Sequence, residues 1–165
     1  MQVFFRISVQ NILSKKVYFM DILSNLSDTL KELKELRGLT ELSIAEGSGI
    51  PVSCISQYVR GKQAPYLDSL IKLADFLHCS VDYLLGKSDD GSEKICKACP
   101  PFAERLEELR KKKGLTSMQI YNAEGISKTS YYEWRRGKSL PTLENLVYLA
   151  KAFDCTIDEV LGRES

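Results

Sequence analysis

Hydrophobic residues recur at helical spacing through most of the chain, and the pattern of residues 26–86 returns in residues 102–162. Leu26, Leu30 and Leu33 form one apolar stripe at the start of the first copy. A period of three to four residues predicts amphipathic helices. The two segments share 21 identical residues over 61 positions at a constant offset of 76 residues. The chain therefore contains an internal duplication, and each copy is predicted to form five short helices in an all-α fold.

The two copies keep their glycines, prolines and threonines in register. Thr40 and Thr116 each precede a short apolar run, and each is expected to cap a helix by accepting from a free helical N–H. Gly49 and Gly125 are expected to supply the left-handed turn that ends this helix. A second short helix then turns its apolar residues into the core, and these are Ile55 and Tyr58 in the first copy and Tyr131 and Trp134 in the second. Two helices joined by a glycine-containing turn predict a helix-turn-helix unit.

Hydroxyl side chains also precede four further predicted helices. We predict N-terminal caps at Ser27, Ser80, Thr142 and Thr156. Thr156 is followed three residues later by Glu159. This spacing predicts a capping box at the last helix of the second copy.

The punctuating residues carry a family resemblance. In each copy Gly-Leu-Thr is followed nine residues later by a glycine, then by Arg-Gly-Lys, a proline, a leucine-rich helix and a final Leu-Gly. This pattern resembles the phage-repressor/Cro-type (XRE family) helix-turn-helix domain over residues 26–88 and 102–163. The resemblance implies two five-helix Cro/lambda-repressor-like domains joined by a linker. It also implies that double-stranded DNA is the partner, with the third helix of each domain in the major groove.

The first copy departs from the family pattern at two places. Glu41 stands where glutamine is common, and Ser117 replaces it in the second copy. Pro51 takes the place of the hydroxyl cap before the third helix, whereas Ser127 keeps that cap. These departures weaken the expectation of DNA binding for the first copy.

The resemblance also implies which residues touch DNA. By register, base edges are met by Val52, Ser53, Ser56 and Gln57 in the first copy and by Lys128, Thr129, Tyr132 and Glu133 in the second. Glutamine pairs with adenine, and lysine reaches the acceptors of guanine. Phosphate contacts are implied for Thr40, Arg60, Lys62, Thr116, Arg136 and Lys138, with Arg135 beside them at the end of the helix.

Two segments lie outside the copies. Residues 1–25 are apolar and form an N-terminal extension, for which three interpretations stay open: an arm that packs on the core or pairs with a second chain, a poorly ordered segment, or sequence upstream of a natural start at Met20. The alternation of Val3, Phe5, Ile7 and Val9 favours a short strand. Residues 89–101 are a polar linker, and the 15 residues from Lys87 to Pro101 span about 50 Å when extended. The linker therefore permits both domains to dock on one duplex.

Charge separates the two halves of the chain. The total formal charge is only +1. From Met20 to Asp90 there are 7 Lys/Arg and 11 Asp/Glu residues, a net of −4, whereas Lys94 to Ser165 holds 13 and 10, a net of +3. The run of Lys111, Lys112 and Lys113 fits two interpretations equally well. One is contact with DNA, and the other is a solvated face at the C-terminal end of a helix, where positive charge is favoured. We expect the second copy to carry most of the affinity for DNA.

The remaining chemistry is sparse. Cys96 and Cys99 form one close pair, but a structural zinc site needs four ligands, and the single histidine, His78, is expected to lie on the far side of a domain. We therefore predict no metal and no cofactor. An odd number of cysteines favours a reducing cytoplasm. The sequence has no apolar run long enough for a membrane span, and no catalytic set that would indicate an enzyme.

The sequence thus favours a sequence-specific transcriptional regulator that acts as a repressor. The alternative is a protein-interaction or antitoxin-like module in which one copy has lost DNA binding. The acidic first copy and the nearly neutral total charge favour that alternative. A homodimer and a protein partner both stay open.

Overall fold

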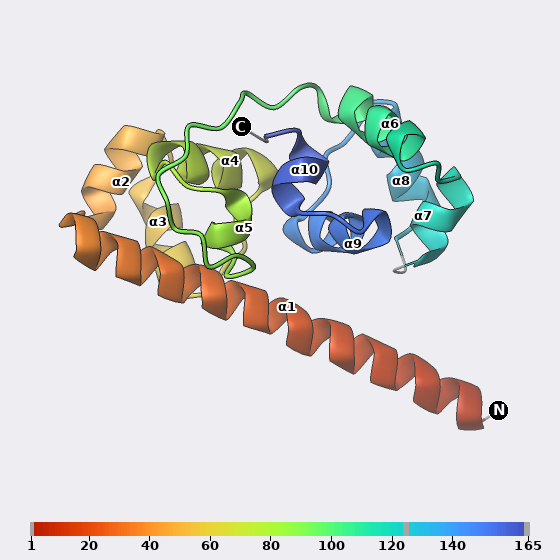
Figure 1. Ribbon diagram of the computed structural model, residues 1–165. Helices are drawn as coiled ribbons and strands as arrows, with labels where there is room; N and C mark the ends of the chain where they lie inside the picture. The colour runs from red at the N-terminus through yellow and green to blue at the C-terminus, as the bar shows by residue number, and fades with distance from the viewer. Residues whose placement is uncertain (1, 124–125, 164–165) are drawn as a thin grey trace.

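The computed structural model describes residues 2–123 and 126–163, and these residues form ten helices and no strand. The first repeat consists of α1 (Gln2–Arg37), α2 (Glu41–Ser48), α3 (Val52–Val59), α4 (Leu67–Phe76) and α5 (Val81–Leu84). The second consists of α6 (Phe102–Lys112), α7 (Ser117–Ala123), α8 (Lys128–Arg135), α9 (Leu143–Phe153) and α10 (Ile157–Leu161). Figure 1 shows the two repeats side by side, with α5 and α10 between them. The predicted pair of five-helix domains is confirmed.

The first repeat folds around the stripe at the end of α1. Leu26, Leu30 and Leu33 are buried and pack with α3, whose Ile55 and Tyr58 are also buried. The Thr40 hydroxyl accepts from the Ser43 N–H at 3.0 Å, and the Ser43 hydroxyl accepts from the Thr40 N–H at 2.9 Å. Gly49 ends α2 with φ of 70°, in the left-handed region that favours glycine. Gly125, its predicted counterpart, lies outside the described residues.

The N-terminal extension is helical, so the predicted strand over Val3–Val9 is wrong. No glycine or proline interrupts residues 2–37, and α1 runs through them as one helix of 36 residues. At about 1.5 Å per residue it is roughly 54 Å long. Its N-terminal half projects beyond the first repeat (Figure 1). Across the described residues, every helix is too short or too polar to cross a membrane.

Ser27 was predicted to cap a helix, and this is also wrong. Ser27 lies inside α1 and is buried. Its hydroxyl donates to the Val59 carbonyl at 2.6 Å. The last carbonyl groups of a helix have no donor within the helix. The Ser27 hydroxyl supplies the donor for one of them at the end of α3.

The second repeat follows the same plan without the extension. Tyr131 and Trp134 are buried at the centre of its core, as predicted. The Thr142 and Thr156 hydroxyls each accept from the N–H three residues later, as caps. The Glu159 carboxylate points away from the predicted capping box and lies 3.4 Å from the Lys112 ammonium.

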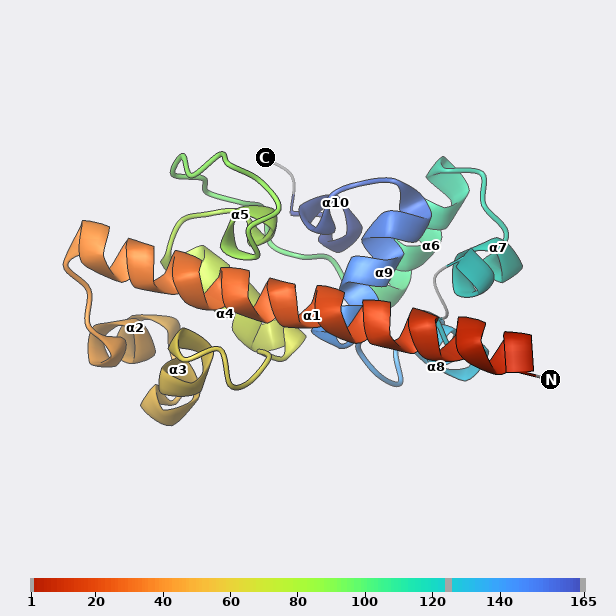
Figure 2. The same cartoon turned by 90° about the horizontal axis from the view of Figure 1, so that it is seen from below.

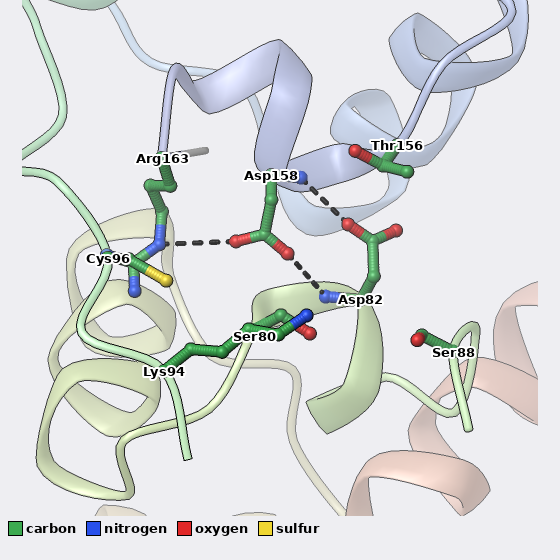
Figure 3. Close-up of a pocket in the computed structure, with 8 residues that line it drawn as sticks. All are labelled: Ser80, Asp82, Ser88, Lys94, Cys96, Thr156, Asp158 and Arg163. Carbon is green, nitrogen blue, oxygen red and sulfur yellow. Dashed lines mark hydrogen bonds and ion pairs between the residues drawn. The ribbon is translucent and has the colours of Figure 1, made fainter. Parts of the chain in front are cut away.

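The repeats are joined by direct contact between α5 and α10. The Asp82 N–H donates to the Asp158 carboxylate at 2.9 Å, and the Asp158 N–H donates to the Asp82 carboxylate at 2.8 Å (Figure 3). The Ile157 N–H donates to the other Asp82 oxygen at 3.0 Å. Each carboxylate thus satisfies free N–H groups in the first turn of the opposite helix, where negative charge is favoured.

An arginine after α10 strengthens this contact. Arg163 is 1% exposed. Its guanidinium lies 2.8 Å from the Asp75 carboxylate of α4 and 3.3 Å from the Asp158 carboxylate. A second bridge comes from Tyr18 of α1, because the Lys151 ammonium of α9 lies 3.9 Å from the centre of its ring. The first repeat therefore holds the second through polar contacts at two places.

We predict that Ser27→Ala lowers the free energy of unfolding. The loss of the donor leaves the Val59 carbonyl unpaired in the core, at a cost of about 1–3 kcal/mol. The better helix propensity of alanine returns only about 0.5 kcal/mol. Urea titration followed by circular dichroism measures the difference. Ser24→Ala, an exposed position one turn earlier, is the control, and equal effects of the two changes would contradict the role of the bond.

We also predict that the contact between the repeats depends on pH. Burial, together with the nearby Asp158, raises the pKa of the Asp82 carboxyl from 3.8 to about 6. The folded protein therefore keeps a proton that the unfolded chain releases, and stability falls as the pH rises from about 4 to 6, by on the order of 2 kcal/mol.

Asp82→Asn abolishes this dependence. The measurement is the free energy of unfolding of parent and variant at several pH values between 4 and 7. Asp21→Asn, at an exposed position of α1, is the control and keeps the dependence of the parent. A constant difference between parent and Asp82→Asn across this range would show that Asp82 does not titrate there.

Candidate nucleic-acid interface

In the second repeat, local caps fix the pair α7–α8. The Thr116 hydroxyl accepts from the Gln119 N–H at 3.2 Å, and the Gln119 side-chain oxygen accepts from the Thr116 N–H at 2.8 Å. The Ser127 hydroxyl accepts from the Ser130 N–H at 3.4 Å. The inward Tyr131 of α8 is anchored in the core. The opposite face of α8 is therefore held toward solvent.

The exposed face of α8 gathers the predicted contact residues of the second repeat. A hollow of about 280 Å³ is lined by Lys128, Thr129, Tyr132, Glu133, Arg136 and Lys138. Lys128, Thr129, Glu133, Arg136 and Lys138 are exposed, whereas Tyr132 is half-buried. The hollow carries three cations and one carboxylate. The structure thus brings six of the sequence-predicted residues together on one surface.

Arg135 is placed differently from its neighbours. Its guanidinium lies 2.9 Å from the Glu107 carboxylate of α6 and 5.6 Å from the centre of the Tyr132 ring. Glu107 also accepts from Arg110 at 2.8 Å, and this bond is the main reason that the pKa of Glu107 is lowered. The charge of Arg135 is therefore partly compensated within the domain. The sequence did not indicate that Arg135 pairs with Glu107, because the two residues lie on different helices.

In the first repeat, an acidic group sits beside α3. The Glu41 carboxylate of α2 accepts a hydrogen bond from the Ser56 hydroxyl and lies 3.5 Å from the Lys34 ammonium. The bond from Ser56 is the main cause that lowers the pKa of Glu41. Glu41 is therefore ionised at neutral pH, and the Ser56 hydroxyl donates to a partner within the protein.

The remaining predicted residues of the first repeat lie on or next to α2 and α3 along the chain. Thr40, Ser53, Arg60 and Lys62 are exposed, and Gln57 is half-buried. Val52, the counterpart of Lys128, is 44% exposed and brings an apolar side chain to the surface. The first surface therefore offers two cations beside a carboxylate, where the second offers three around its hollow.

Cys96 of the cysteine pair lines the same hollow as His78, so the expectation that His78 lies on the far side of a domain is wrong. The linker folds back on the first repeat, where the Lys94 N–H donates to the His78 carbonyl at 2.8 Å. His78 and Cys96 then line the same hollow of about 260 Å³. Even so, within residues 2–123 and 126–163 there is no cluster of three or more side chains that could hold a metal ion.

The comparisons with known proteins match this arrangement. A family model described as helix-turn-helix matches residues 30–84 and again residues 106–160. The chain belongs to the helix-turn-helix family. The double match confirms both the resemblance and the tandem duplication that the sequence predicted.

Curated helix-turn-helix relatives are similar over the length of one repeat. The chain is 47% identical over 60 residues to the cryptic phage CTXphi transcriptional repressor RstR of Vibrio cholerae. It is 46% identical over 61 residues to the HTH-type transcriptional regulator AnsR of Bacillus subtilis. It is 40% identical over 63 residues to the HTH-type transcriptional activator BcrR of Enterococcus faecalis.

Each match covers only part of this chain and only part of the relative. They cover 36–38% of this chain, and they span about half of RstR and AnsR and 31% of BcrR. No solved structure matches the chain at a significant level. The similarity therefore concerns the helix-turn-helix unit and leaves the rest of each relative aside.

Proposed function

We propose that this protein is a sequence-specific DNA-binding transcriptional regulator, a repressor, that places α3 and α8 in the major groove. The observation that carries the proposal is the exposed surface of α8, where Lys128, Arg136 and Lys138 surround one hollow on a helix-turn-helix unit. Relatives of this family are named as transcriptional repressors, regulators and activators. Selection of bound duplexes from a random library tests the proposal, and failure to enrich any sequence would overturn it.

Each exposed side chain has a chemical role on DNA in this proposal. Lys128 and Gln57 meet base edges, because lysine reaches guanine acceptors and glutamine pairs with adenine. Ser53, Ser56, Thr129, Tyr132 and Glu133 lie beside them on the same helices and complete the base-reading sets. The phosphate backbone is met by Thr40, Arg60, Lys62, Thr116, Arg136 and Lys138. Arg135 contributes mainly by holding Tyr132, since its own charge faces Glu107.

The second repeat carries most of the affinity in this proposal. Binding to DNA draws largely on the release of counterions from phosphates. The first repeat holds Glu41 against its third helix, whereas the second has the neutral Ser117 at that position. Lys128 adds a cation where the first repeat has Val52. Glu133 opposes this trend but faces three exposed cations around the hollow.

A second candidate function follows from the Glu41–Ser56 bond. It engages a serine that would otherwise read a base, and it keeps a negative charge at the surface of α3. In this alternative the first repeat holds a protein partner, as in an antitoxin-like module, and the second repeat alone binds DNA.

Removing one proposed phosphate contact from each repeat in turn compares their contributions to the affinity for DNA. We expect Arg136→Ala to weaken binding of the selected duplex more than Arg60→Ala, because Arg136 belongs to the more cationic surface. The slope of log affinity against log salt should fall by about one unit for Arg136→Ala. Fluorescence anisotropy at several salt concentrations measures both effects. A larger loss for Arg60→Ala would assign the main affinity to the first repeat instead.

Exchange of the residues at position 41 and its counterpart tests the role of the carboxylate. Glu41→Ser removes a charge that repels phosphates, a repulsion of about 1 kcal/mol at the surface of DNA, so we expect severalfold tighter binding. Ser117→Glu should weaken binding by a similar factor. Glu46→Ser, at an exposed position of the same helix, is the control. If Glu41→Ser leaves affinity unchanged while Ser117→Glu weakens it, the first repeat does not approach DNA and the alternative function gains support.

A further inference from the structure

The contact between the repeats has the form of a two-fold interface inside one chain. Asp82 and Asp158 occupy equivalent positions of the duplication, 76 residues apart. The N–H of each donates to the carboxylate of the other, at 2.9 Å and 2.8 Å. Reciprocal contacts between equivalent residues define an isologous interface, in which a half-turn exchanges the two partners. The duplication is therefore arranged head to head and not as a direct repeat in space.

The same half-turn relates the helices that face DNA. In Figure 1, rotation by half a turn in the plane of the picture, about a point between α5 and α10, carries α2 toward α7 and α3 toward α8. In Figure 2, α3 and α8 both lie in the lower part of the view, below α5 and α10. The two recognition helices therefore face the same side of the molecule in opposite senses.

The interface is built of buried polar groups, which fix its geometry. Asp82 is 7% and Asp158 is 8% exposed. Arg163 reaches across from the second repeat to Asp75 of the first, at 2.8 Å. Its equivalent in the first repeat is Lys87, which is exposed and donates to the Tyr18 hydroxyl at 2.6 Å. A parallel arrangement would break these pairings, which supply the partners that buried charges need.

The two recognition surfaces differ at every base-reading position. Val52 and Lys128 are equivalent, and so are Gln57 and Glu133. The same holds for Ser53 and Thr129 and for Ser56 and Tyr132. Side chains with different donors and acceptors read different base edges. The half-turn therefore relates two surfaces of the same shape and different chemistry.

From these observations we infer that the DNA target is one inverted pair of unlike half-sites, read by a single copy of the chain. This inference rests on the proposed function. A homodimer of identical subunits needs two copies to cover an inverted pair, and it reads the same sequence in both halves. Here the covalent pair reads a left and a right half that differ. The linker only connects two domains whose orientation the α5–α10 contact has already set.

The experiment uses the full chain and four duplexes. A library selection first supplies the two half-site sequences, and an enriched motif by itself tests the proposed function. The halves are then placed as an inverted pair, a direct repeat, an everted pair and a single half-site with unrelated flanking sequence. Fluorescence anisotropy gives the affinity for each. We expect the inverted pair to bind roughly 100-fold more tightly than the single half-site, through the high effective concentration of the second domain.

Variants that weaken the α5–α10 contact test whether this contact sets the preferred arrangement of the half-sites. Asp158→Asn and Arg163→Ala, alone and together, should leave binding of the single half-site within about twofold of the parent, because both residues lie away from α3 and α8. The ratio of the affinities for the inverted pair and the direct repeat should fall toward one, because the linker alone tolerates both arrangements. Asp28→Ala/Lys31→Ala removes an exposed ion pair of α1 and is the matched control. Circular dichroism verifies that each variant is folded, and Asp158→Asn alone suffices if the double variant is not.

Two outcomes would overturn the inference while the proposed function stands. The first is equal affinity for the direct repeat and the inverted pair. The second is a selected motif with two identical halves, bound by two copies of the chain as measured by light scattering. Absence of any enriched sequence would instead remove the proposed function itself.

Discussion

The structure depends on two aspartates that each cap the helix of the other. Helices of four or five residues, such as α5 and α10, are too short to persist on their own. Their first N–H groups also point into the contact, where Asp82 and Asp158 are both buried. A carboxylate from the opposite helix supplies the acceptor and a favourable charge at once. Because one residue type plays both roles, a duplicated sequence can build the contact from two identical positions.

This symmetry is imperfect, and the deviation stabilises the pair. Two carboxylates in close proximity repel each other, and the raised pKa of Asp82 reflects burial and that repulsion. A buried cation is the usual compensation, and Arg163 supplies it on one side only. Its equivalent, Lys87, instead contacts Tyr18. The chain thus uses a difference between its copies to balance a charge that their identity creates.

The sequence predicted what is fixed by local geometry. Thr40, Gly49 and Trp134 could be assigned because capping, a left-handed turn and an inward aromatic each follow from a few neighbouring residues. Ser27 was misread for the same reason, since serine is a common cap, and its true acceptor at Val59 lies 32 residues away. The strand expected near the N-terminus came from a short alternation. A long segment without glycine or proline continued the helix instead.

The contact between the copies could not be predicted from the sequence, although Asp82 and Asp158 occupy equivalent positions in the two copies. An aspartate in the first turn of a helix is already explained by the helix dipole, so Asp82 and Asp158 carried no signal of a partner. The candidate site shows the same limit. The register placed Arg135 with the other cations, but only the fold brings Glu107 against it. Pairs formed between distant elements are decided by packing, which a single sequence does not display.

A duplicated domain within one chain is free of a constraint that applies to every homodimer. In a homodimer, a change on the DNA-facing surface alters both half-sites at once, because the two subunits share one sequence. Here α3 and α8 are encoded separately, so one surface can exchange lysine for valine or glutamine for glutamate while the other is unchanged. The core of the second repeat tolerates changes at the exposed positions of α8, because Lys128, Thr129 and Glu133 are exposed while Tyr131 and Trp134 are buried. The internal pairing thus keeps two domains in a symmetric arrangement while their recognition surfaces become chemically different.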